Sequence, residues 1–116
     1  MRDGEPDELP PSATERVIEV LAEHGDALTT VREIDHFSYF PDVQSRERYL
    51  DKCITAGFKL RALTEPPVTD DLRFGAIVFH NDIPDEEVLL RVHALLTELA
   101  SAEGGKYDGW ETQLIV

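Results

Sequence analysis

The sequence is poor in cysteine, in basic side chains and in long apolar runs, and each shortage excludes a class of protein. Cys53 is the only cysteine among 116 residues, so an intramolecular disulfide cannot form and no cysteine-based zinc site is available. No apolar run approaches the roughly 20 residues that a membrane-spanning helix needs, and no apolar segment typical of an export signal follows Met1. We therefore expect a soluble cytoplasmic protein.

Basic residues number 11 against 24 acidic residues, which gives a formal net charge of -13. Proteins that bind DNA or RNA contact the phosphates with many Lys and Arg side chains, and this chain has few of them. We therefore expect no direct binding to nucleic acid. The acidic excess lies in residues 1–26 and 70–103, each with eight acidic and two basic residues and therefore a charge of -6. Acidic faces can serve solubility alone, but they also attract basic segments of a protein partner.

The first 11 residues are rich in proline, glycine and charge, and Leu9 is almost their only apolar side chain. They predict a flexible tail over 1–11, followed by a single domain over 12–116. Ser12 and Glu15 have capping-box spacing, which predicts a helix from Ser12 to Gly25.

Six further elements are predicted, in the order β-α-β-β-α-β. They are a strand over 29–40, a helix capped by Asp42 and ended by Gly57, a half-buried strand over 58–63, a strand over 72–80, a helix from Pro84 to Gly104, and a strand over 107–116.

This order is typical of the α+β ferredoxin-like two-layer sandwich, here with an extra N-terminal helix. Its antiparallel sheet has the strand order 4-1-3-2, and its two crossover helices cover one face. The other face stays open unless the N-terminal helix, a partner subunit or a ligand covers it.

Tyr107 to Trp110, with the sequence Tyr-Asp-Gly-Trp, is the most unusual motif, because it places a glycine and the only tryptophan inside a predicted strand. In a regular strand Tyr107 and Trp110 point to opposite faces, with Asp108 on the tryptophan side. Either Trp110 packs beneath the helices with Leu114 while Asp108 accepts backbone hydrogen bonds, or Tyr107 anchors a partner on the open face.

This motif, together with two aromatic pairs in the first predicted strand, resembles the RraB family of regulators of ribonuclease E activity. The resemblance extends over about residues 12–115 and includes the order of elements. It implies a ferredoxin-like fold and an acidic bacterial protein that binds and inhibits ribonuclease E and changes which transcripts the enzyme cuts. The residues that carry the resemblance are His36, Phe37, Tyr39, Phe40, Tyr107, Asp108, Gly109 and Trp110.

Side chains capable of catalysis show no spacing typical of a catalytic or metal site. The four histidines lie on four different predicted elements: His24, His36, His80 and His93. His36 and His80 lie on neighbouring strands and approach only if the register allows. Asp35 and Asp108 are a possible acid–base pair, but no nucleophile or phosphate-binding loop accompanies them. We expect no enzyme activity, cofactor or metal, and a buried, inert thiol at Cys53.

The sequence thus predicts a non-enzymatic acidic regulatory protein whose partner is ribonuclease E or another protein with a basic segment. Two alternatives stay open. One is a small ligand-binding or enzymatic domain that uses the open sheet face around His36, Tyr39 and Tyr107, and the other is a structural module that forms a homodimer. The residues predicted to contact a partner are Glu15, Glu19, Glu23, Asp85, Glu86, Glu87 and Tyr107.

Overall fold

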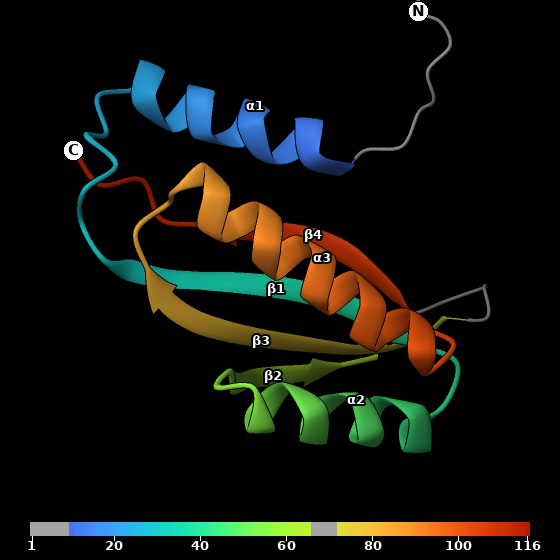
Figure 1. The fold of residues 1–116 in the computed structure, drawn as a ribbon. Coiled ribbons are helices and arrows are strands. Elements are labelled where there is room, and N and C mark those ends of the chain that lie inside the picture. The colour runs from blue at the N-terminus through green and yellow to red at the C-terminus, as the bar shows by residue number, and fades with distance from the viewer. Residues whose placement is uncertain (1–9, 66–71) are drawn as a thin grey trace, which may run out of the picture.

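A computed structural model describes residues 10–65 and 72–116. This part of the chain forms three helices and one four-stranded antiparallel sheet, an α+β architecture (Figure 1). The elements are α1 (Pro10–Glu23), β1 (Arg32–Phe40), α2 (Val43–Thr55), β2 (Lys59–Thr64), β3 (Phe74–Asp82), α3 (Glu86–Ala102) and β4 (Lys106–Thr112).

The strands lie in the order β2-β3-β1-β4, which is the predicted order 4-1-3-2 read from the other edge of the sheet. Each neighbouring pair is antiparallel, and β1 at the centre pairs with both β3 and β4. Alternate residues of β1, from Arg32 through His36 to Phe40, are buried, because they face the helices.

The hydrophobic core lies between α2, α3 and one face of the sheet. The rings of Phe40 and Tyr49 pack with their centroids 4.7 Å apart, and Leu96 of α3 is fully buried beside them. Cys53 is a free buried thiol of this core, as predicted, and burial raises its pKa to about 11. Burying one large apolar side chain contributes about 1.5–3 kcal/mol, so these contacts hold both helices on the sheet.

Both ends of α2 follow the sequence prediction. The Asp42 carboxylate accepts a hydrogen bond from the backbone N–H of Ser45 at 2.7 Å, which satisfies a donor that the first helical turn leaves unpaired. Gly57 follows the helix with φ of 106°, a left-handed conformation that suits glycine.

Several predicted boundaries are wrong by a few residues. α1 begins at Pro10, so Ser12 lies in its first turn and not at its cap, while residues 1–9 of the predicted tail lie outside the described residues. α3 begins at Glu86, two residues after the predicted start at Pro84, because Asp85 is its N-cap. Proline suits the first position of a helix, so Pro10 is compatible with the start of α1.

β2 is more exposed than the predicted half-buried strand. Leu60 and Leu63 are 43% and 50% exposed. The register between β2 and β3 shifts between Leu60 and Ala62, so Arg61 is an extra residue that breaks the alternation of faces. β2 also lies at the edge of the sheet, where only one neighbour covers it.

α1 packs beside α3, on the side away from α2 (Figure 1). The indole Nε1 of Trp110 in β4 donates a hydrogen bond to Thr14 Oγ1 of α1 at 3.1 Å. The N-terminal helix therefore joins the helical layer, and none of the three described helices covers the opposite sheet face. None of them combines the length and apolar character that crossing a membrane requires.

Candidate partner-binding surfaces

The Tyr-Asp-Gly-Trp motif forms a β-bulge in β4. Between Tyr107 and Gly109 the register with β1 shifts, so Asp108 is an extra, exposed residue. Gly109 has φ of 115°, a conformation that favours glycine. The extra residue resets the alternation, so Tyr107 and Trp110 both point toward the helices. The prediction that they lie on opposite faces is wrong.

Trp110 contacts the helical layer, as one of the two predictions proposed, but its partner differs. It binds Thr14 of α1, whereas Leu114 lies beyond the end of β4 and is 43% exposed. The strand ends at Thr112 and not at residue 116 as predicted. The predicted acid pair does not form either, because Asp35 lies opposite Glu111 and binds Arg61 at 2.8 Å.

Tyr107, His36 and His80 form a hydrogen-bonded row between the sheet and α3. His36 Nδ1 lies 2.9 Å from the hydroxyl of Tyr107, and its Nε2 lies 3.0 Å from His80 Nε2. The ring of His93, on α3, meets the Tyr107 ring edge-on at 5.0 Å between centroids. Within residues 10–65 and 72–116, no group of three or more His, Cys, Asp or Glu side chains is placed to hold a metal ion.

Burial keeps this row uncharged at neutral pH. Desolvation, helped by the nearby His80 and His93, lowers the pKa of His36 to about 3. Burial also lowers the pKa of His80 and His93, and it raises the pKa of Tyr107. His36 and Tyr107 therefore belong to the packed layer. The alternative that placed them on the open sheet face is wrong about their position.

The acidic residues predicted to meet a partner lie on two neighbouring helices. α1 and α3 pack side by side, so segments far apart in sequence form one surface (Figure 1). We call it the α1/α3 acidic surface. Its residues are Glu15, Glu19 and Glu23 of α1, Asp85 at the cap of α3, and Glu86 and Glu87 in the first turn of α3; all are exposed except the half-buried Asp85.

Glu15 and Glu86 meet across the two helices. A hydrogen bond to the Glu15 side chain raises the pKa of Glu86, and partial desolvation and the charges of Glu15 and Asp85 act in the same direction. Ionised carboxylates on adjacent helices repel each other, so a cation placed between them is favoured.

Other carboxylates of this surface have partners within the described chain. Glu19 accepts from Arg16 one turn away at 3.1 Å, and Asp85 accepts from the backbone N–H of Val88 at 3.0 Å. Glu15, Glu23, Glu86 and Glu87 are therefore the residues best placed to contact a basic partner.

The uncovered sheet face is a second candidate surface, and it is aromatic. Phe37 and Tyr39 of β1 lie there beside Ile77 and Phe79 of β3, all of them half-buried. Of these four residues only Tyr39 was predicted to lie on the open face, whereas Phe37 was named only among the residues that carry the family resemblance. The alternation of β3 carried the signal for Ile77 and Phe79. The face holds a shallow hollow of about 410 Å³, lined by Phe37, Tyr39, Thr64, Glu65, Ala76 and Ile77. A second, of about 360 Å³, is lined by Glu33, Asp35, Arg61, Glu111, Thr112 and Gln113.

The α+β chain thus presents an acidic helical surface and an uncovered aromatic sheet face, two surfaces suited to contacts with other proteins. The family model described as "Regulator of ribonuclease activity B" matches residues 12–112. Because this match covers most of the chain, the chain belongs to the RraB family, as the Tyr-Asp-Gly-Trp motif predicted. A search of curated proteins found no match.

Proposed function

We propose that this protein is a non-enzymatic cytoplasmic regulator that binds a basic segment of ribonuclease E and inhibits its cleavage of RNA. Family membership supports the regulatory role. The packing of α1 against α3 gathers exposed carboxylates from both helices on one surface, which supports the basic partner, and it is the observation that carries the proposal. We also propose that the β-α-β-β-α-β part of the chain is ferredoxin-like and that α1 is an addition to it.

The α1/α3 acidic surface acts at two stages of binding. Before contact, its charge attracts a basic segment over a Debye length of about 8 Å at physiological salt, which speeds the encounter. On contact, a Lys or Arg side chain between Glu15 and Glu86 replaces the repulsion of two carboxylates with two attractive interactions.

The buried row of Tyr107, His36 and His80 supports a non-enzymatic role. An acid–base catalyst needs a pKa near the working pH and access to a substrate. The pKa of His36 is lowered to about 3 and its side chain is fully buried. We therefore propose that these side chains stabilise the packing between α3 and the sheet.

The proposal is tested by the cleavage of a structured RNA by purified ribonuclease E in the presence of this protein. We expect the wild type to slow cleavage and the Glu15→Lys/Glu86→Lys double variant to lose that effect. Glu47→Lys/Asp51→Lys is the matched control, because it makes the same charge change at exposed positions of α2. If the wild type leaves cleavage unchanged, the proposed inhibition of ribonuclease E is wrong. If the Glu15→Lys/Glu86→Lys variant inhibits as fully as the wild type, the α1/α3 acidic surface is not the contact.

A further inference from the structure

The uncovered sheet face already holds one arginine of the protein itself. The guanidinium carbon of Arg61 lies 4.2 Å from the centroid of the Phe79 ring, a cation–π distance. Its nitrogens bind Asp35 at 2.8 Å and also the carboxylate of Glu33. A ring face with carboxylates at its edge is therefore how this surface binds a guanidinium.

The hollow of about 410 Å³ on the same face offers similar chemistry and contains no basic lining residue. We call it the Tyr39 hollow. Phe37, Tyr39 and Ile77 give it aromatic and aliphatic walls, and Glu65 places a carboxylate at its rim. Glu65 forms an ion pair with the buried Arg46 at 3.8 Å, yet its side chain is 61% exposed, so its carboxylate also remains accessible to a second cation.

Gly75 keeps the Tyr39 hollow in its present shape. It lies opposite Tyr39 in the pairing of β1 with β3. A Cβ atom at this position would lie 2.9 Å from the Tyr39 ring and 2.3 Å from Thr64 Oγ1, closer than real contacts allow. The missing side chain therefore lets the ring lie close to β3 and form a wall of the hollow.

We propose that the Tyr39 hollow binds an arginine side chain of the basic partner segment. The aliphatic stem of that arginine packs against Phe37 and Ile77, and its guanidinium contacts the Tyr39 ring within reach of Glu65. This inference rests on the proposed function, because the arginine belongs to the same basic segment that meets the α1/α3 acidic surface.

Charge complementarity identifies the occupant. A protein with a net charge of -13 repels an RNA strand and also a second copy of itself, whereas it attracts a positively charged side chain. Arginine fits better than lysine because its planar guanidinium stacks on rings and its fork binds carboxylates in pairs, whereas an ammonium is a compact, strongly hydrated charge. The residues that define the acidic helical surface are all carboxylates, so an arginine preference that depends on the Tyr39 ring is the signature of the hollow.

The test uses two synthetic peptides of equal length and charge, one with arginine and one with lysine, spaced by glycine and serine. We expect the wild type to bind the arginine peptide about three- to fivefold more tightly, the ratio that one added cation–π contact gives. Tyr39→Leu keeps an apolar side chain but removes the ring, so it should abolish the preference. Tyr39→Phe keeps the ring and should retain it. Amide NMR shifts of Phe37, Thr64 and Ile77 should follow the same pattern.

The outcomes separate this inference from the proposed function. A Glu15→Lys/Glu86→Lys variant that binds both peptides more weakly but still prefers arginine supports both. Equal binding of the two peptides, unaffected by Tyr39→Leu, overturns the hollow and leaves the acidic surface standing. Two other outcomes also overturn the inference, provided that the wild type shows no preference for arginine. If the wild type binds a uridine oligonucleotide and Tyr39→Leu does not, the hollow binds RNA. If the wild type self-associates in sedimentation and Tyr39→Leu does not, the hollow binds a second copy of the chain.

Discussion

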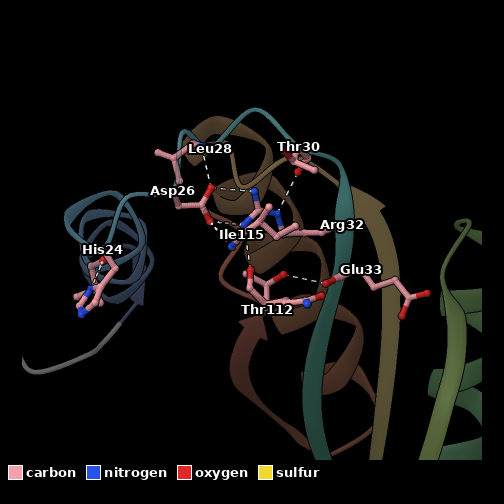
Figure 2. Close-up of polar contacts among 10 residues, drawn as sticks. His24, Asp26, Leu28, Thr30, Arg32, Glu33, Thr112 and Ile115 are labelled. Carbon is pink, nitrogen blue, oxygen red and sulfur yellow. Dashed lines mark hydrogen bonds and ion pairs between the residues drawn. The ribbon is translucent and has the colours of Figure 1, made fainter.

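Asp26 and Arg32 form a buried, two-pronged ion pair at the junction between α1 and β1 (Figure 2). The guanidinium donates to the two carboxylate oxygens at 2.5 and 3.0 Å. Asp26 also accepts from the backbone N–H of Ile115, and Arg32 donates to the carbonyl of Gln113. The pair thereby fastens the segment after β4 to the start of β1.

Asp26→Asn should be strongly destabilising. It leaves a buried arginine charge without its counter-ion, which typically costs about 3–5 kcal/mol of unfolding free energy. Urea denaturation measures this cost. Glu33→Gln is the control, because Glu33 lies nearby in an exposed ion pair with Arg61 that contributes about 1 kcal/mol or less. Equal losses in the two variants would show that Asp26 contributes no more than a surface carboxylate.

Stability should fall as the pH falls from about 6.5 toward 3. In this range a histidine of the unfolded chain binds a proton, whereas His36, whose pKa is lowered to about 3, stays neutral in the folded protein. The unfolded state then holds more protons, so acid favours unfolding, by about 1.4 kcal/mol per pH unit for one group. His80 and His93 shift in the same direction.

Chemical denaturation at a series of pH values tests this dependence. His36→Gln should flatten the profile, because glutamine does not titrate. His24→Gln is the matched control, since His24 is exposed just after the end of α1 and lies outside the buried row. Below about pH 4 a second loss of stability should begin. The hydrogen bonds from Arg32 lower the pKa of Asp26 in the folded protein, so Asp26 stabilises the fold at any pH above its unfolded pKa. This contribution is lost as the pH falls from the unfolded pKa toward the folded pKa of Asp26.

Complex formation with a basic partner should slow as salt rises. Screening weakens the attraction between separated charges, so we expect the association rate to decrease from low to moderate salt. Glu15→Lys/Glu86→Lys should slow association more than Glu47→Lys/Asp51→Lys. Stopped-flow fluorescence gives these rates. An association rate that responds to neither salt nor charge reversal rejects electrostatic steering.

Two glycines should respond to alanine for different reasons. At Gly109 nothing lies within 4 Å of an added Cβ, so Gly109→Ala costs only the left-handed backbone conformation, about 1–2 kcal/mol. At Gly105 an added Cβ would lie 2.3 Å from the Phe40 ring, so Gly105→Ala must displace the core and should cost more. Thermal unfolding compares them, and a larger loss at Gly109 would contradict this ranking.

Tyr107→Phe should change stability and leave partner binding intact. The hydroxyl hydrogen-bonds His36 inside the layer, and its loss costs about 1 kcal/mol. A binding defect larger than the stability defect would restore Tyr107 as a partner contact. Calorimetric binding measured beside thermal unfolding separates the two effects.

The order of elements and the strand order were predictable, because each depends on local periodicity and on short connections. The error in the faces of Tyr107 and Trp110 comes from the bulge at Asp108, and the bulge at Arg61 breaks the predicted alternation of β2. Assigning alternate residues to alternate faces assumes that a strand has no residue inserted relative to its paired strand. One inserted residue moves every later side chain to the other face of the sheet. Gly109 inside a strand was the available signal for such a bulge. The error at His36 has another cause: it lies three residues from Tyr39 in a regular strand, so the two cannot share a face. The contact of His36 with His80 depends on register, which neither strand specifies alone.

The position of α1 has a consequence for selectivity. Trp110 holds this helix near its start, at Thr14, and the pair of Asp26 and Arg32 holds the chain just after its end. The backbone that carries Glu15 is thus preorganised against α3, and much of its ordering entropy is lost during folding and not during association. A partner must therefore match a fixed spacing of negative charges, so two basic segments of equal charge but different spacing should differ in affinity.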